Sequence, residues 1–194
     1  MRTSARRSTA AFTLIELMIV VAIVGILAML ATYGVRKYIS QSKAAEATNS
    51  LGNMANAAVA VYESNETNPN TSVLALGSTL GFDHVMCKGA SAMVPSSKTL
   101  IQGRKYQSSW ADWTTDAAGD SGFACLKFTM DQPQYYMYGY TTKGSASPGD
   151  TFTCIANGDL SGDGILSTYS ITGAINSSYI LNVAPNIYEV DSDE

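Results

Sequence analysis

A single apolar run near the N-terminus constrains this chain more than any other feature. Residues 12–35 read FTLIELMIVVAIVGILAMLATYGV, and Glu16 is the only charged residue among them. As a helix rising about 1.5 Å per residue, the run would reach about 36 Å, which is enough to cross the hydrocarbon core of a bilayer. We therefore expect residues 12–35 to form a transmembrane helix.

The helix is expected to continue well beyond the apolar run. Apolar residues recur at spacings of four and three in the next segment, which places them on one helix face: Ala47, Leu51, Met54, Ala58 and Val61. The stretch at 63–71, ESNETNPNT, holds the turn-forming residues that end a helix. We predict one long helix over residues 12–65, in which 12–35 serves membrane insertion and assembly and 36–65 is amphipathic.

The rest of the chain, residues 66–194, is predicted to form a globular head. Residues 66–122 show no sustained period and are interpreted as an irregular loop. Strand candidates follow at 123–130, 134–141, 151–156 and 166–172, separated by turn clusters, and indicate an antiparallel sheet over 123–190. The expected fold class is α+β, with the long helix packed on a small antiparallel sheet.

Three interpretations compete for the N-terminus. The first eleven residues hold three arginines and no acid, which is typical of a cytoplasmic flank. A secretory signal peptide has a shorter apolar run and a clear cleavage site after it, and this chain has neither. A plain membrane anchor leaves Glu16 unexplained, because a carboxylate in a membrane helix costs a few kcal/mol.

The third interpretation rests on the string AFTLIE, residues 11–16. This string resembles the prepilin cleavage and methylation motif of type IV pilins and type II secretion pseudopilins. The resemblance implies that a prepilin peptidase removes a leader peptide, residues 1–11, by cutting between Ala11 and Phe12. The new amino group of Phe12 would then be N-methylated. The family usually has glycine before the cut, and this chain has Ala11 instead.

The resemblance implies a pilin fold and a role as structural subunit of a type IV pilus-like filament. Its partners would be copies of itself, other pilins, the prepilin peptidase and a pilus assembly platform in the inner membrane. The precursor would sit in the inner membrane with the leader in the cytoplasm and the head in the periplasm, before the subunit joins an extracellular pilus filament. Two alternatives stay open: a type II secretion pseudopilin, or a minor or tip pilin whose head is an adhesin. Nothing in the head selects among twitching motility, cell adhesion and DNA uptake.

Glu16 gains a physical role within this interpretation. Filament assembly would bury the Phe12 ammonium and the Glu16 carboxylate, each of which is costly to bury alone. Paired between neighbouring subunits, they neutralise each other, and only at one axial offset. We therefore expect Glu16 to set the register of assembly.

The head holds three cysteines, Cys87, Cys125 and Cys154, all in the part expected to be exported. Export to an oxidising compartment permits a disulfide, but sequence alone does not fix the pairing. We favour Cys87 with Cys125, because Cys154 lies in an alternating strand pattern that suits a small buried residue.

The stretch DLSGDG at 159–164 allows two interpretations. Asp159, Ser161 and Asp163 offer oxygen ligands at alternate positions, like the first half of a calcium-binding loop. The same residues also suit a tight turn between strands. We favour the turn, because Ser170 occupies the twelfth loop position where an EF-hand has glutamate.

Charge and motif content weigh against two other classes of function. The chain has 12 basic and 16 acidic residues, and an acidic head repels nucleic acid, so we expect no nucleic-acid partner. His84 and Cys87 are close enough in sequence to suggest a nucleophile pair or a metal site, but neither has a third partner nearby. We expect no enzymatic activity and no cofactor, apart from the calcium interpretation.

Overall fold

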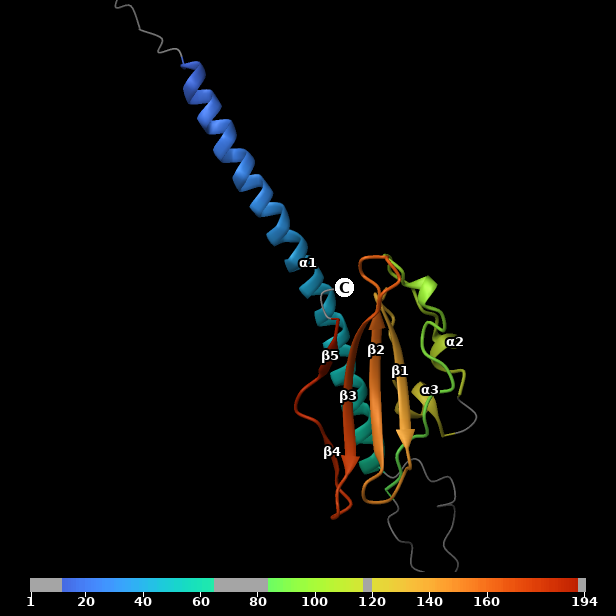
Figure 1. Ribbon diagram of the computed structural model, residues 1–194. Helices are drawn as coiled ribbons and strands as arrows, with labels where there is room; N and C mark the ends of the chain where they lie inside the picture. The colour runs from blue at the N-terminus through green and yellow to red at the C-terminus, as the bar shows by residue number, and fades with distance from the viewer. Residues whose placement is uncertain (1–11, 65–83, 117–119, 192–194) are drawn as a thin grey trace, which may run out of the picture. The chain divides into compact units, whose positions relative to one another are not determined.

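The computed structural model describes residues 12–64, 84–116 and 120–191 (Figure 1). The expected leader, residues 1–11, and much of the expected loop before residue 84 lie outside these ranges. The chain divides into two compact units between Ile39 and Ser40. The first unit contains the N-terminal part of helix α1, Leu14–Ser64, and the second contains the rest of α1 and the head.

The head is an antiparallel sheet with one long helix and several short ones. The sheet strands are β1 Tyr136–Lys143, β2 Thr151–Gly158, β3 Ser167–Ile175, β4 Leu181–Val183 and β5 Tyr188–Val190. Their spatial order is β1-β2-β3-β4, and β5 also pairs with β3. The short helices are η1 Lys98–Leu100, α2 Trp110–Trp113 and α3 Gly122–Leu126. The expected α+β fold is confirmed.

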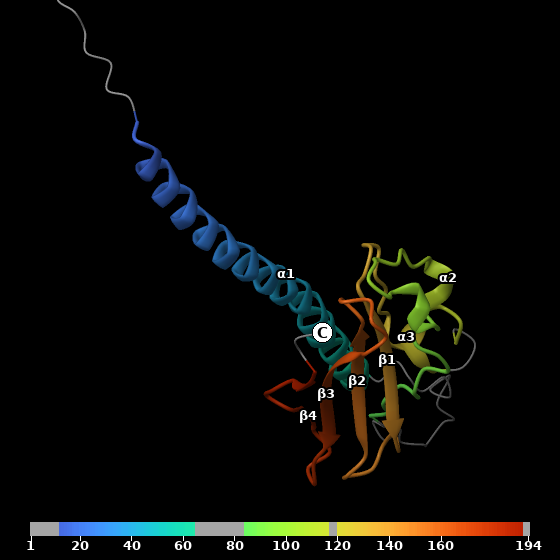
Figure 2. The ribbon, with the colours of Figure 1, turned by 45° about the horizontal axis from the view of Figure 1, so that its top comes forward.

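The C-terminal half of α1 covers one face of the sheet (Figures 1 and 2). The residues of its predicted apolar face are all buried: Ala47, Leu51, Met54, Ala58 and Val61. They share one core with three alternate residues of β1, namely Tyr136, Tyr138 and Tyr140. Alanines on the helix leave room for these large rings, so the aromatic residues fill the space between the two layers.

One half-buried carboxylate also joins α1 to the sheet. Glu46 Oε1 accepts a hydrogen bond of 2.7 Å from the backbone N–H of Tyr135, just before β1. Burial raises the pKa of Glu46 above its usual value, and the amide hydrogen bond and nearby Lys105 oppose that rise. The ammonium groups of Lys43 and Lys105 lie 4.8 and 4.5 Å from the centre of the Tyr135 ring, within the range of cation–π contacts.

The prediction of a strand at 123–130 is wrong, and the sheet begins at Tyr136 instead of residue 123. Residues Gly122–Leu126 form the short helix α3, which ends at Lys127 in the left-handed backbone region (φ 54°). Phe123 and Leu126 are one helical turn apart, and both are buried. The Phe123 ring meets Trp113 edge to face at 4.9 Å, so a helical turn, not an extended strand, satisfies the core.

Both β1 and β3 carry further backbone partners, on the sides that face away from β2. Beside β1, the segment before η1 forms backbone hydrogen bonds from Ala90 and Val94 to Tyr140 and Tyr138. Beside β3, β4 pairs with residues 173–175 and β5 with residues 168–170. Between these two short strands, the N–H of Ala184 donates to the carbonyl of Thr172. The two three-residue strands therefore cover β3 almost end to end.

Candidate assembly segment

The N-terminal part of α1 exposes an unbroken apolar surface. Every large apolar side chain between Phe12 and Ile39 is exposed, from 47 % at Ile39 to 84 % at Phe12. Among the described residues, α1 is the one helix long and apolar enough to cross a membrane. Apolar surface on this scale is unfavourable in water, so the segment requires lipid or other protein chains around it.

Thr13 and Glu16 together build the start of this helix. The Glu16 Oε2 atom accepts hydrogen bonds from the Thr13 backbone N–H at 3.0 Å and from the Thr13 hydroxyl at 2.7 Å. In return, the Glu16 N–H donates to the Thr13 hydroxyl oxygen at 3.3 Å. This reciprocal pattern is a capping box, in which an N-cap threonine and a glutamate three residues later satisfy free amides at the helix start.

The cap uses only one of the two carboxylate oxygens of Glu16. Both hydrogen bonds that the carboxylate accepts from described residues use Oε2. The other oxygen, Oε1, has no partner among the residues that the structure describes. The cap therefore fixes the carboxylate at the helix start and leaves one oxygen open to a cation. Thr13 was not among the residues predicted from the sequence, although it stands at the Thr-x-x-Glu spacing that marks a capping box.

Comparison with protein families identifies this segment. The family described as the prokaryotic N-terminal methylation motif matches residues 6–32. The chain carries the type IV prepilin-like signature. Comparisons with curated proteins and with solved structures found no match for the chain.

The prepilin-like signature covers the second half of the expected leader, the expected cleavage site and most of the apolar run. It is found on structural proteins of the pilin type and not on an enzyme family. Together with the apolar helix behind it, the signature fits a precursor anchored in a membrane. Phe12 is the first described residue, and Ala11 lies just outside the described part of the chain.

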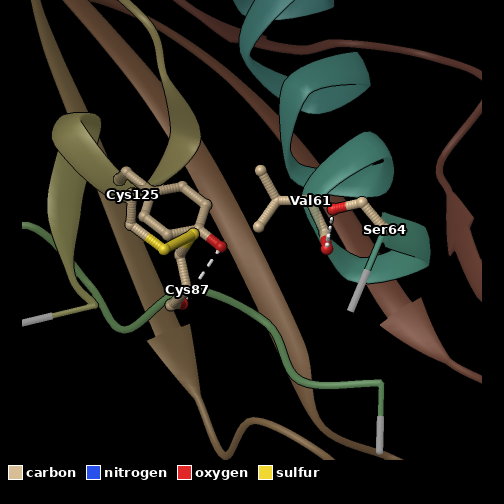
Figure 3. Close-up of a disulfide and its surroundings, with 5 residues drawn as sticks. Val61, Ser64, Cys87 and Cys125 are labelled. Atoms are coloured by element: carbon tan, nitrogen blue, oxygen red, sulfur yellow. Dashed lines mark hydrogen bonds between the residues drawn. A yellow bond between two sulfur atoms is a disulfide. The ribbon is translucent and has the colours of Figure 1, made fainter. Parts of the chain in front are cut away.

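The structure joins Cys87 and Cys125 in a disulfide with a Cα–Cα distance of 5.8 Å. The bond ties the segment before η1 to α3, across 38 residues of sequence. Figure 3 shows the bond near the end of α1. The Tyr140 hydroxyl donates to the Cys87 carbonyl at 3.3 Å. Cys154 is a buried free thiol in β2, and burial raises its pKa to about 12.

The disulfide also removes the nucleophile pair considered from sequence, because Cys87 has no thiol to ionise. His84 contacts Tyr62 instead. Its Nδ1 atom is 2.9 Å from the Tyr62 carbonyl oxygen, and its ring centre is 5.2 Å from that of Tyr62. Within the described ranges, no group of three or more His, Cys, Asp or Glu side chains is arranged to hold a metal ion.

The Asp159 region is built as a turn. Its carboxylate is 2 % exposed, and its two oxygens accept the backbone N–H groups of Gly162 at 2.7 Å and Gly164 at 2.9 Å. Asp163 instead accepts from the N–H of Ile165 at 2.8 Å. Because the carboxylates already serve backbone amides, these residues fit a turn better than a calcium loop. Calcium binding at Asp159, Ser161 and Asp163 stays a prediction.

Proposed function

We propose that this chain is a structural subunit of a type IV pilus-like filament. One observation carries the proposal: the prepilin-like signature lies on a helix segment whose large apolar side chains, between Phe12 and Ile39, are all exposed. A prepilin peptidase cuts between Ala11 and Phe12, so the helix is retained while the leader is lost. The freed amino group of Phe12 is then N-methylated.

Assembly moves the helix from lipid into a bundle of neighbouring helices. The apolar surface stays covered throughout, because neighbouring copies replace the lipid. The Phe12 ammonium is then placed in an apolar surrounding and needs a counter-charge. Glu16 Oε1 of a neighbouring subunit supplies it, while Oε2 remains with the Thr13 cap of its own helix. The capped carboxylate thus sets the register between subunits.

The precursor is held in the inner membrane with its head in the periplasm, and the assembled filament is extracellular. Other copies of the chain, other pilins and the assembly platform are its partners. The acidic head, with 6 basic and 15 acidic residues from Ala44 onward, is not expected to bind nucleic acid. A type II secretion pseudopilin uses the same assembly physics and is the second candidate.

Replacing Glu16 by glutamine tests the proposal. The amide keeps the size and one cap-accepting oxygen but cannot neutralise a neighbouring ammonium. We expect Glu16→Gln to leave cleavage intact and to reduce sheared filament yield at least about tenfold, since a lost ion pair in an apolar bundle costs several kcal/mol. Immunoblots of sheared and membrane fractions measure both steps.

Glu63→Gln is the matched control, because Glu63 is an exposed glutamate near the other end of the same helix. It should assemble like the wild type. Normal filament yield from Glu16→Gln would contradict the assembly role. Filaments that stay short and within the periplasm would favour the pseudopilin.

A further inference from the structure

A cavity of about 520 Å³ opens on the head beside α2 and α3. Its volume lies within the range of small-molecule sites, which is roughly 300–1,000 Å³. Its buried members are Val61 at the end of α1 and Phe123 in α3, and Cys125 of the disulfide also lines it. Its exposed members include Trp110 and Asp120. None of these residues belongs to the assembly segment.

The wall of this cavity is held rigidly. The Cys87–Cys125 disulfide fixes α3 to the segment before η1. In Figure 3 the Val61 side chain points from α1 toward that disulfide. Phe123 is anchored in the core against Trp113. A rigid wall favours binding, because little conformational freedom is lost when a ligand enters.

Trp110 presents an unused aromatic face at this cavity. Its side chain is 72 % exposed, whereas Trp113 in the same short helix is 1 % exposed. The Trp110 ring has no aromatic or hydrogen-bonding partner among the described residues. Tryptophan is highly buried on average, and exposed examples are enriched where a protein binds something. The ring offers a flat apolar surface and one N–H donor.

The polar lining supplies both acceptors and donors. Asp116 and Asp120 contribute carboxylates, and that of Asp120 has no partner in the described ranges. Asp116 Oδ2 already accepts the N–H of Ser91 at 2.9 Å. Thr114 and Lys127 add a hydroxyl and an ammonium. The Thr114 hydroxyl donates to the Trp110 carbonyl at 3.1 Å, so its oxygen is still able to accept.

The indole of Trp110 and the polar lining together favour some classes of ligand over others. A pyranose has one flat C–H face for an indole and hydroxyl groups that both donate and accept, so it matches carboxylates, an ammonium and hydroxyls at once. An anionic ligand would meet two carboxylates in an acidic head. A simple cation would meet the ammonium of Lys127, and a wholly apolar ligand would strip water from the charged lining.

We propose that this cavity binds an uncharged saccharide, with one sugar ring stacked on Trp110 and its hydroxyls bound by Asp116 and Asp120. The proposal concerns the head alone. It goes beyond the structural role in the filament and does not require that filaments form.

The test uses the full-length chain in a polyoxyethylene detergent, whose head group contains no sugar. An array of neutral, N-acetylated and sialylated oligosaccharides is screened first, and saturation-transfer NMR with the monosaccharides of any hit follows. We expect neutral glycans to bind and sialylated ones of the same core to be rejected. Trp110→Ala should weaken binding by about tenfold, and Trp110→Phe, which keeps an aromatic face, by less.

Tyr188→Ala is the matched control, because Tyr188 is 68 % exposed on β5 and does not line the cavity. It should bind like the wild type. Asp120→Asn, at an exposed position, gives a second variant that should fold normally and bind more weakly. The proposal is overturned by an array without hits, by preferred binding of sialylated glycans or organic amines, or by binding that survives Trp110→Ala. Filament yield of the same variants is scored separately, so either proposal can fail alone.

Discussion

Glu46 shows how one residue can weigh against stability at neutral pH while joining two layers of the head. Its carboxylate accepts the Tyr135 amide, but burial raises its pKa. A carboxyl group with a raised folded-state pKa adds stability that is fully present below its unfolded pKa of about 4.3. That stability is lost as the pH rises through the folded pKa.

Glu46→Gln keeps an acceptor for the Tyr135 amide and carries no charge to desolvate. We expect this variant to have a higher melting temperature than the wild type at pH 7, with the difference shrinking as the pH falls toward 4. Circular dichroism melts between pH 4 and 7 measure it. Glu46→Ala, which leaves the amide unpaired, should lose about 1–2 kcal/mol at pH 4 and less at pH 7, where the substitution also removes a buried charge. A glutamine variant that is less stable at pH 7 would contradict the burial argument.

At the scale of elements, the sequence located the strands that carry a clear period. Strands expected at 134–141, 151–156 and 166–172 are found as β1, β2 and β3, displaced by only a few residues. β4 and β5 were missed because three residues cannot display a period of two. Residues 123–130 were mistaken for a strand because Phe123 and Phe128 become neighbours of Trp113 only in three dimensions.

The two candidate sites also differ in how far the sequence could predict them. The N-terminal motif is local in sequence, so its residues were predictable, and even the overlooked Thr13 follows a four-residue pattern. The cavity beside Trp110 was not predictable. It gathers residues from α1, α2, α3 and the segments after α2 and α3, and these lie up to 68 residues apart, between Val61 and Thr129. No spacing rule connects such positions.

The disulfide between α3 and the segment before η1 should account for part of the head's stability. We expect the double variant Cys87→Ser, Cys125→Ser to lose about 2–4 kcal/mol, because the open chain gains conformational freedom when unfolded. A reductant should lower the melting temperature of the wild type and leave that of the double variant unchanged.

Iodoacetamide labelling with intact-mass analysis counts the free thiols, and peptide mapping without reduction identifies the paired cysteines. The folded protein should take up no label, since Cys154 is buried and its pKa is raised to about 12. The unfolded protein should take up one label before reduction and three after it. Labelling of the folded, unreduced protein would show that Cys154 is accessible.

The turn between β2 and β3 depends on the carboxylate of Asp159. Asp159→Ala leaves the amides of Gly162 and Gly164 unpaired and should cost about 1–3 kcal/mol. We expect the melting temperature of the wild type to be the same in millimolar calcium and in EDTA. A rise with calcium that Asp159→Ala abolishes would establish the metal site instead.

The whole molecule combines two units with different surroundings. An apolar helix segment needs lipid or neighbouring helices, whereas the head has its own core and disulfide. In the proposed sequence of events, cleavage between the leader and Phe12 creates the charge that assembly then uses. Processing therefore has to precede polymerisation.

Mass spectrometry of sheared surface material tests that order. The subunit should begin at Phe12 and carry one N-terminal methyl group. Ala11→Gly, which places the glycine usual in type IV pilins before the cut, should be processed at least as fast as the wild type in a pulse-chase experiment. A filament subunit that still begins at Met1 would exclude this route.

The backbone partners beside β1 and β3 matter most when many heads are crowded together. A filament holds its subunits at a local concentration far above that of free protein, and open strand edges would then join chains into continuous sheets. Here β1 faces a backbone partner and β3 is shared by two very short strands. In the proposed filament, neighbouring heads would therefore not pair with β1 or β3 and would rely more on contacts between side chains. Such contacts can diverge by point mutation while the fold persists, which would let the outer surface change quickly under selection.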